Sequence, residues 1–230
     1  MCDVVEPWAH GTVLQATRYP GYFDLNLVRV EDDPAMSAEA LIAFSDEALA
    51  GVAHRRVDFD RVDAGEPLRA DFEARGWRAE RLVWMRHEAS PPPASDLSVE
   101  AVPYDAASDL RLAWSREDFP GQNPAPYLAA ARDVALRSGA RVLAVRERQV
   151  LVGFAQVLRD GATVEITHVY VHPDYRGSGR GTALTRAAIH DAGDVRDIWI
   201  VADDEGKAKN IYAQLGFRPA WRKMEFLRLP

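Results

Sequence analysis

Short segments in which hydrophobic and polar residues alternate predict strands, and stretches with helical spacing predict the helices between them. In the first 90 residues we expect strands at 11–17, 23–30, 54–59 and 79–86, and helices at 37–51 and 67–75. The remainder predicts strands at 97–102, 141–145, 150–158, 164–171, 197–202 and 221–229, and helices at 106–114, 126–138, 179–190 and 207–215. Strands and helices do not alternate strictly, so the pattern indicates an α+β fold with a mixed sheet.

A proline-rich segment divides the chain. Pro91, Pro92 and Pro93 are consecutive, and proline can neither continue a helix nor donate to a sheet ladder. Such a run favours an extended, semi-stiff connector. We therefore expect a smaller domain at residues 1–90, a linker at 91–96 and a second domain at 97–230.

The two halves share a short internal similarity. Phe-Glu-Ala-Arg-Gly-Trp-Arg at residues 72–78 resembles Tyr-Ala-Gln-Leu-Gly-Phe-Arg at 212–218. Each stretch is predicted to end a helix, turn at a glycine and enter a strand. Glycine is common after a helix in any fold, but the elements preceding each copy also correspond. We therefore favour a duplication.

Composition and charge exclude several classes of protein. The chain has 230 residues and a net charge of −7, and its first 90 residues hold 17 acidic and 10 basic side chains. Without a basic stripe, binding to nucleic acid is not expected. There is no apolar run of about 20 residues for a membrane span and no signal-peptide pattern, so a cytoplasmic protein is expected. Cys2 is the only cysteine, and no histidine spacing suggests a metal site.

The segment with the clearest chemistry is Arg176-Gly-Ser-Gly-Arg-Gly181, which follows a predicted strand and opens a helix. A helix N-terminus offers unpaired N–H groups and a partial positive charge, and glycines let an anion approach the backbone. A Walker A loop is excluded because no lysine follows Gly181. A dinucleotide fingerprint lacks its third glycine, and too little chain follows for a Rossmann sheet.

The remaining match is to a known family. Arg176, Gly179 and Gly181 fit the cofactor motif Arg/Gln-x-x-Gly-x-Gly/Ala, and Ala208 and Tyr212 stand before Leu-Gly-Phe as in its second signature. Residues 97–230 thus resemble the GNAT superfamily of N-acetyltransferases. The resemblance implies a mixed, mostly antiparallel sheet flanked by helices. The first 90 residues then resemble a degenerate GNAT-like domain without a cofactor site.

The resemblance also implies the positions of the cofactor contacts. The strand at 164–171 should diverge from its neighbour so that the pantetheine arm of acetyl-CoA lies in the gap, with the pyrophosphate on the amides of the glycine-rich turn. The expected cofactor-binding residues are Val169, Tyr170, Val171, Arg176, Gly177, Ser178, Gly179, Arg180, Gly181, Thr182 and Ala208. In one respect the sequence departs from many relatives, because Glu205 stands where they have an asparagine.

Two residues are the candidates for proton transfer. Tyr212 occupies the position of the family's thiolate-protonating tyrosine, and a phenol with a pKa of about 10 suits that donation. Glu165 lies eleven residues before Arg176, where some GNAT enzymes place a catalytic carboxylate. Strict alternation would put Glu165 on the same strand face as Val169 and Val171. His168, expected on the other face against a helix, and His172 at the strand exit are weaker alternatives.

We therefore expect an acetyl-CoA-dependent N-acetyltransferase that acts by direct transfer, without a metal, on a primary amine of a small molecule. The alternatives are a protein N-terminus or lysine as acceptor, and a non-catalytic module that binds acyl-CoA. The sequence identifies neither the acceptor nor the length of the acyl group. Both a monomer and a homodimer fit it.

Overall fold

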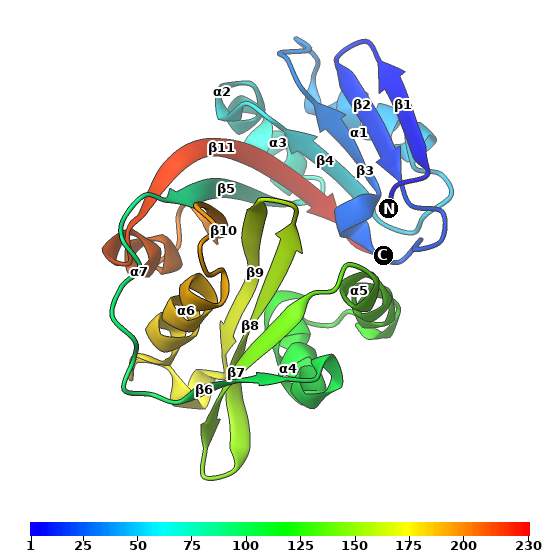
Figure 1. Ribbon diagram of the computed structural model, residues 1–230. Coiled ribbons are helices and arrows are strands. Elements are labelled where there is room, and N and C mark those ends of the chain that lie inside the picture. Colours follow the sequence, from blue (N-terminus) through cyan, green and yellow to red (C-terminus); the bar gives the residue numbers. More distant parts are fainter. The chain divides into compact units, whose positions relative to one another are not determined.

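The computed structural model describes residues 1–230, and the chain divides into two units (Figure 1). The first unit comprises Met1–Val83, Asp203–Glu205 and Trp221–Pro230, and the second comprises Trp84–Ala202 and Gly206–Ala220. This division differs from the predicted boundary at residues 91–96, because the chain passes into the second unit after Val83, and Asp203–Glu205 and Trp221–Pro230 group with the N-terminal half.

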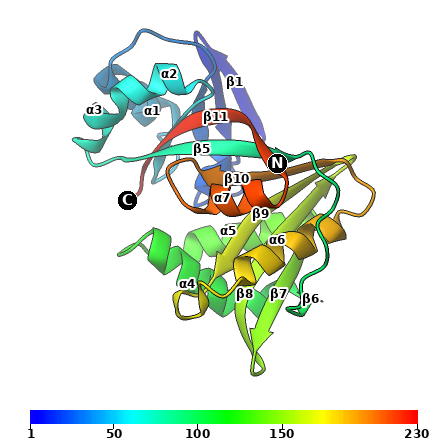
Figure 2. The same cartoon turned by 90° about the vertical axis from the view of Figure 1, so that its left-hand side faces the viewer.

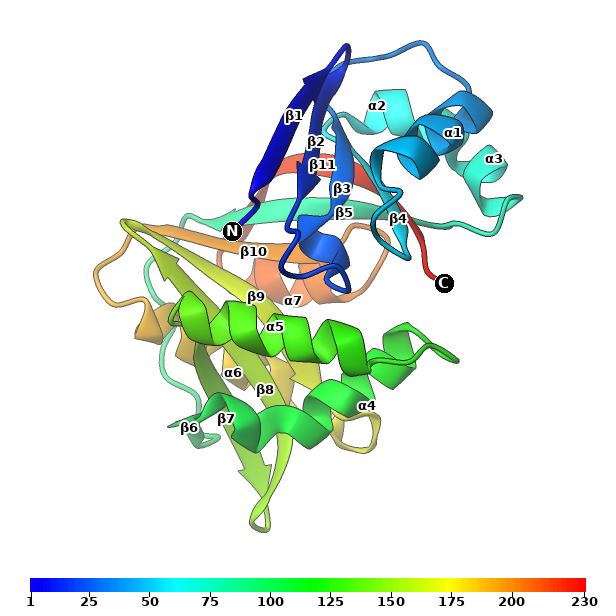
Figure 3. The same cartoon turned by 90° about the vertical axis from the view of Figure 1, so that its right-hand side faces the viewer.

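The first unit contains a sheet with three short α-helices packed on one face (Figure 3). Its strand order is β1-β2-β3-β4-β11. The strands are β1 (Val4–Trp8), β2 (Gly11–Gln15), β3 (Leu27–Val30), β4 (Arg55–Phe59) and the end of β11 (Phe217–Arg228). The helices are α1 (Ala38–Ala48), α2 (Val62–Gly65) and α3 (Arg69–Glu73), with 3₁₀ turns at Phe23–Leu25 and Glu66–Leu68.

Local sequence explains these elements. The Ser37 side chain accepts a hydrogen bond from the Ala40 amide at 3.2 Å and so caps α1 at the start of the helix predicted at 37–51. The core beneath the helices combines aliphatic and aromatic side chains, and the rings of Phe72 and Phe226 stack in it at 4.1 Å between centroids. Trp77, which follows the turn after α3, packs edge-on against Phe72.

The strand predicted at 23–30 forms only in its second half. The Asn26 side chain is fully buried, accepts from the Ala16 amide, and donates to the carbonyls of Tyr19 and Tyr22. These hydrogen bonds pair backbone groups of the loop that would otherwise be buried without a partner. They stabilise a turn at this position, and β3 begins only after it. The edge strand β1 was not predicted, because its side chains are mostly exposed and it contains a proline.

The second unit has a five-stranded sheet core, with the order β10-β9-β8-β7-β6. Its strands are β6 (Val99–Val102), β7 (Arg141–Glu147), β8 (Val150–Asp160), β9 (Thr163–Val171) and β10 (Asp197–Asp203), and β5 (Arg78–His87) enters it from the first unit. Its helices are α4 (Ser108–Asp118), α5 (Ala125–Arg137), α6 (Arg180–Asp191) and α7 (Ala208–Gln214), with 3₁₀ turns at Tyr104–Ala107 and Pro173–Tyr175. Neighbouring strands are antiparallel except for the parallel pair β9 and β10.

Helices cover both faces of this sheet. Leu110 of α4 and Ala135 of α5 pack on one face with Phe154 and Tyr170. Leu184 of α6 packs on the other face with Val171. Figure 2 shows α6 and α7 on the side of the sheet opposite α4 and α5. The fold class predicted from the sequence is therefore confirmed.

The hairpin between β7 and β8 lacks an Asn-Gly turn. Arg148 and Gln149 both adopt positive φ, 47° and 75°, which is the left-handed conformation that a two-residue hairpin turn requires. The two strands predicted at 141–145 and 150–158 are thus joined by a tight turn, formed by residues that rarely adopt this conformation.

The two units have the same core connectivity. In each unit three consecutive antiparallel strands are followed by a helix and then by a fourth strand, which pairs parallel with the third strand. The two series are β1-β2-β3-α1-β4 and β7-β8-β9-α6-β10. The correspondence supports the duplication inferred from the sequence. The segments before the two helices differ, because the first holds Glu31, Asp32 and Asp33 where the second holds glycines and arginines.

The final strand explains the boundary between the units. Residues Met224 to Arg228 of β11 pair antiparallel with Phe59 to Arg55 of β4 in the first unit. The start of β11 lies in the second unit, directly after α7. The last strand of the C-terminal half therefore completes the sheet of the first unit.

Candidate active site

Strands β9 and β10 diverge after four paired residues. Their parallel register runs from Thr163 opposite Asp197 to Ile166 opposite Ile200 and then stops, although both strands continue. On its other side β9 remains paired with β8 as far as Val171. Residues 169–171 therefore have no strand partner on the β10 side, at the place where the gap between strands was predicted; on that side Arg176 Nε donates to the Val171 carbonyl.

A bulge lies at the point of divergence and changes which way Glu165 faces. His168 pairs with Gln156 and Ile166 with Val157, so Thr167 is an extra residue in β9. Beyond the bulge the alternation is reversed, and Glu165 lies on the α4 and α5 side of the sheet with His168. Val169 packs on the α6 side. The predicted shared face of Glu165 and Val169 is thus wrong, because strict alternation does not survive an inserted residue.

The glycine-rich turn forms an open cradle at the N-terminus of α6. Gly177 and Gly179 have φ of 80° and 78°, a conformation that favours glycine. A Cβ built on Gly177, Gly179 or Gly181 would meet no atom within 4 Å. Gly179 is the N-cap residue and no side chain caps the helix. The first N–H groups of α6 are therefore available to an anion from outside the helix.

One cavity of about 650 Å³ joins these features. Such a volume is within the range of small-molecule sites. Its predicted lining residues are Val169, Tyr170, Val171, Arg176, Gly177, Gly179, Arg180, Gly181, Thr182, Ala208 and Tyr212. Ser178 does not line it, because its hydroxyl donates to the carbonyl of Tyr175 at 3.1 Å and so braces the turn. Glu165 lies outside the lining as well.

Three further residues line this cavity that the sequence analysis did not identify: Tyr175, Lys207 and Ile211. Tyr175 precedes Arg176 in the turn, and Lys207 directly precedes Ala208. Ile211 lies one residue before Tyr212. Their proximity to motif residues was the one sequence signal that could have indicated them.

Arg176 is held by a carboxylate and a carbonyl. Its Nη1 and Nη2 lie 2.7 and 2.8 Å from the two oxygens of Glu117, and its Nε donates to the Val171 carbonyl at 2.8 Å. Glu117 also accepts from the Tyr170 hydroxyl at 3.3 Å. The hydrogen bonds from Arg176 lower the pKa of Glu117, and burial together with Glu117 raises the pKa of Tyr170 to about 12. Arg176 thus braces the end of β9 as well as bordering the cavity.

Arg180 has a similar arrangement. Its Nη2 lies 2.5 Å from Glu147, and its Nη1 donates to the Tyr175 carbonyl at 3.1 Å. Its Nε is buried without a hydrogen-bond partner. A buried donor without a partner is costly, and an anion in the cradle would provide an acceptor.

Tyr212 lies at the α7 side of the cavity. Its side chain is almost fully buried, and this burial raises the pKa of the phenol to about 12. The hydroxyl therefore stays protonated at neutral pH and can act only as a proton donor there. Glu205, the residue that departs from the family pattern, does not line the cavity and pairs with Arg69 at 3.1 Å.

His168 packs as predicted. Its ring contacts Trp114 of α4 edge-on at 5.2 Å and lies over Phe154 at 6.5 Å. Trp114 in turn contacts Phe119 and Tyr127, so these three aromatic residues form a cluster.

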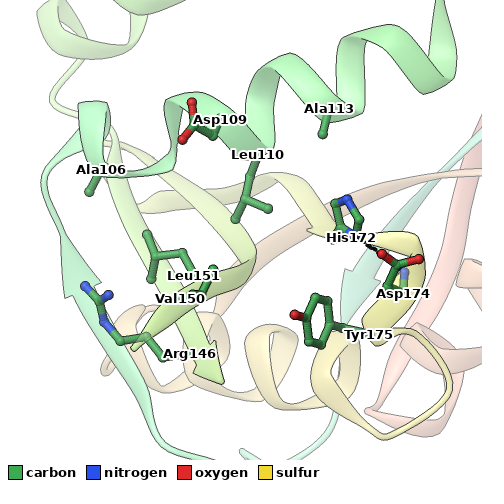
Figure 4. Close-up of a pocket in the computed structure, with 10 residues that line it drawn as sticks. All are labelled: Ala106, Asp109, Leu110, Ala113, Arg146, Val150, Leu151, His172, Asp174 and Tyr175. Atoms are coloured by element: carbon green, nitrogen blue, oxygen red, sulfur yellow. Dashed lines mark hydrogen bonds and ion pairs between the residues drawn. The ribbon is translucent and has the colours of Figure 1, made fainter. Parts of the chain in front are cut away.

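A second cavity, of about 570 Å³, lies between α4, the β7–β8 hairpin and the turn after β9 (Figure 4). His172 and Asp174 line it, and the imidazole Nδ1 lies 3.6 Å from the aspartate. Tyr175 borders both cavities. Seven residues of extended chain separate Glu165 from His172, roughly 20 Å at the usual rise per residue. His172 is therefore far from Glu165.

The first cavity thus combines two features: a sheet that opens between β9 and β10, and a glycine-rich helix N-terminus beside the opening. The family model for the Acetyltransferase (GNAT) family matches residues 108–217. No curated protein matches the sequence.

Solved structures support the same fold across more of the chain. A functionally unknown conserved protein from Staphylococcus epidermidis matches with a TM-score of 0.75 at 15% identity, over 99% of this chain and 94% of its own. A GCN5-related N-acetyltransferase from Sphaerobacter thermophilus matches with a TM-score of 0.55 at 18% identity, over 87% of this chain and 73% of its own. A tandem GNAT protein from the clavulanic acid biosynthesis pathway matches with a TM-score of 0.53 at 15% identity, over 88% of this chain and 75% of its own. At these identities the similarity concerns the fold alone.

Two structural observations concern other classes of ligand. No three His, Cys, Asp or Glu side chains are grouped so that they could hold a metal ion. None of the helices combines the length and the apolar character needed to span a bilayer.

Proposed function

We propose that this protein is an acetyl-CoA-dependent N-acetyltransferase that moves an acetyl group directly to a primary amine of a small molecule. The observation that carries the proposal is a single cavity that combines the edge of β9 without a strand partner, the uncapped N-terminus of α6 and the hydroxyl-bearing Tyr212. A cytoplasmic location, expected from the sequence, belongs to the same proposal.

The residues present fit acetyl-CoA. The glycine cradle has room that any Cβ would reduce, and Arg180 Nε lacks an acceptor that a phosphate oxygen would supply. The amides of Gly179, Arg180 and Gly181 would hold the pyrophosphate, and Val169 and Val171 would bond the pantetheine arm through their backbone. When bound, acetyl-CoA supplies an activated acetyl thioester.

Proton transfer is assigned to two side chains. Transfer requires a neutral amine and the return of a proton to the departing thiolate. Tyr212, with its raised pKa, carries that proton at neutral pH. Glu165, on the α4 and α5 side of the sheet, is the candidate base that deprotonates the amine.

The proposal is tested by calorimetric titration of acetyl-CoA into the protein and into Gly181→Leu. Gly181 has no positive φ and open space around its Cα, so the substitution should not impair folding, and leucine favours a helix more than glycine does. Its side chain would occupy the cradle. We expect binding to the wild type and loss of at least tenfold in affinity for the variant, followed by amine-dependent thiol release. The proposal fails if a folded wild-type protein does not bind acetyl-CoA, or if it binds but acetylates no amine.

A further inference from the structure

Three cationic side chains line the cavity, and two of them are already paired. Arg176 is held by Glu117 and Arg180 by Glu147, at 2.7 and 2.5 Å. Each arginine therefore contributes little net positive charge to the cavity. Lys207 lines the same cavity and has no ion pair or hydrogen bond through its side chain.

The acidic residues near Lys207 in the sequence are engaged elsewhere. Glu205 pairs with Arg69 at 3.1 Å and with Arg81 at 3.6 Å. Asp203 accepts a hydrogen bond from the Glu205 amide at 2.8 Å. Neither carboxylate therefore pairs with Lys207, which lines the cavity.

The cradle of α6 provides a limited attraction for phosphate. A helix N-terminus is equivalent to about half an elementary charge, whereas a phosphorylated nucleotide thioester carries several negative charges. A lysine ammonium is a mobile point charge on a long stem and binds phosphate without requiring fixed geometry. Lys207 is the lining residue that can supply the missing positive charge.

We propose that Lys207 binds a phosphate of the acyl donor and makes this site select a phosphorylated donor over a bare pantetheine thioester. The inference rests on the proposed function of the same cavity. It adds a specificity residue outside the glycine-rich motif and outside the residues assigned to proton transfer.

The test compares three donors by calorimetry: acetyl-CoA, its form without the 3′-phosphate, and acetyl-pantetheine, which has no phosphate. In Lys207→Met the affinity for acetyl-CoA should fall about tenfold, the size of one charge-assisted hydrogen bond, and should become less dependent on salt. Binding of acetyl-pantetheine should be unchanged. If the loss persists without the 3′-phosphate, Lys207 binds the pyrophosphate; if it disappears, Lys207 binds the 3′-phosphate.

Two variants serve as controls. Lys207→Arg keeps the charge and should retain most of the affinity for acetyl-CoA. Lys209→Met removes a lysine of α7 that does not line the cavity, and it should leave the affinity unchanged. The inference is overturned if Lys207→Met binds acetyl-CoA as the wild type does, or loses acetyl-pantetheine equally. In either case the proposed function stands if the wild type binds acetyl-CoA and acetylates an amine; if the wild type does not bind acetyl-CoA, both proposals fall.

Discussion

Arg176 and Glu117 form a bidentate ion pair that links the glycine-rich turn to the last turn of α4, with N–O distances of 2.7 and 2.8 Å. A carboxylate near a helix C-terminus is unfavourable by itself, so Arg176 offsets a cost at that position. Because Arg176 also holds the Val171 carbonyl, the pair fixes the end of β9 relative to α4.

This pair predicts a dependence of stability on pH. Arg176 lowers the pKa of Glu117 in the folded state, so its contribution is present above the ordinary glutamate pKa of about 4.3 and is lost as pH falls through the lowered value. At pH 7 Glu117→Gln should lower the free energy of unfolding by at most about 1 kcal/mol, because both side chains are partly exposed. Urea unfolding should show this difference shrinking towards zero as pH falls towards about 3. A constant difference would mean that the pair does not act through charge.

Tyr212→Phe separates an enzyme from a non-catalytic acyl-CoA-binding module. The hydroxyl of Tyr212 remains protonated below about pH 12, so its loss should reduce kcat by about 100-fold at neutral pH and leave acetyl-CoA affinity nearly unchanged. The deficit should shrink above the thiol pKa of about 8.5, where the thiolate can leave without a proton. Steady-state rates from pH 6 to 10 measure this. Tyr104→Phe, which removes a hydroxyl outside the cavity, is the control, and an equal loss in both variants would contradict the role.

Gly153 is expected to be essential for the close approach of β8 to β9. A Cβ at this position would lie 2.9 Å from the Tyr170 carbonyl oxygen and 3.2 Å from a methyl of Leu184. Gly153→Ala should therefore cost about 1–3 kcal/mol of stability and should weaken acetyl-CoA binding, because β9 must shift beside the cavity. Gly51→Ala, where nothing lies within 4 Å, should change stability by less than about 0.5 kcal/mol. Thermal unfolding of both variants provides the comparison.

Replacing one residue of a buried ionic network in the first unit should lower the free energy of unfolding more than breaking a surface ion pair. Arg56 lies 2.9 Å from Asp58, 2.5 Å from Glu225 and 2.6 Å from Asp24. Arg56→Met would leave the buried carboxylates of Asp58 and Glu225 with Lys223 as their one remaining cationic partner, at a cost of about 3 kcal/mol. Arg61→Met breaks the exposed pair with Asp63 and should cost less than about 1 kcal/mol. Similar values for both in denaturant unfolding would show that the network adds nothing.

The final strand predicts that the C-terminal half does not fold well alone. A fragment of residues 97–230 retains β11 but lacks β4, its partner, and so exposes an unpaired strand. We expect this fragment to aggregate, and co-expression with residues 1–90 to restore a soluble complex. Size-exclusion chromatography distinguishes the outcomes, and a monodisperse, cooperatively unfolding fragment would contradict the prediction.

The sequence determined most of the local structure and the cofactor motif. Helix caps, turns and anion-binding glycines act over a few residues, so Ser37 and the segment from Arg176 to Gly181 could be interpreted without the fold. The divergence of β9 from β10 was expected from the family resemblance, and the register agrees with it.

Tertiary structure decided the rest, because those features depend on pairing between distant segments. The bulge at Thr167 arises from the register of β9 against β8, and it turned Glu165 to the face that alternation had excluded. The pairing of β11 with β4 placed the end of the chain in the first unit. Ion pairs from Glu117 and Glu147 occupied two arginines and left Lys207 as the unpaired cation of the cavity. No spacing along the chain encodes these contacts, since each joins residues that only folding brings together.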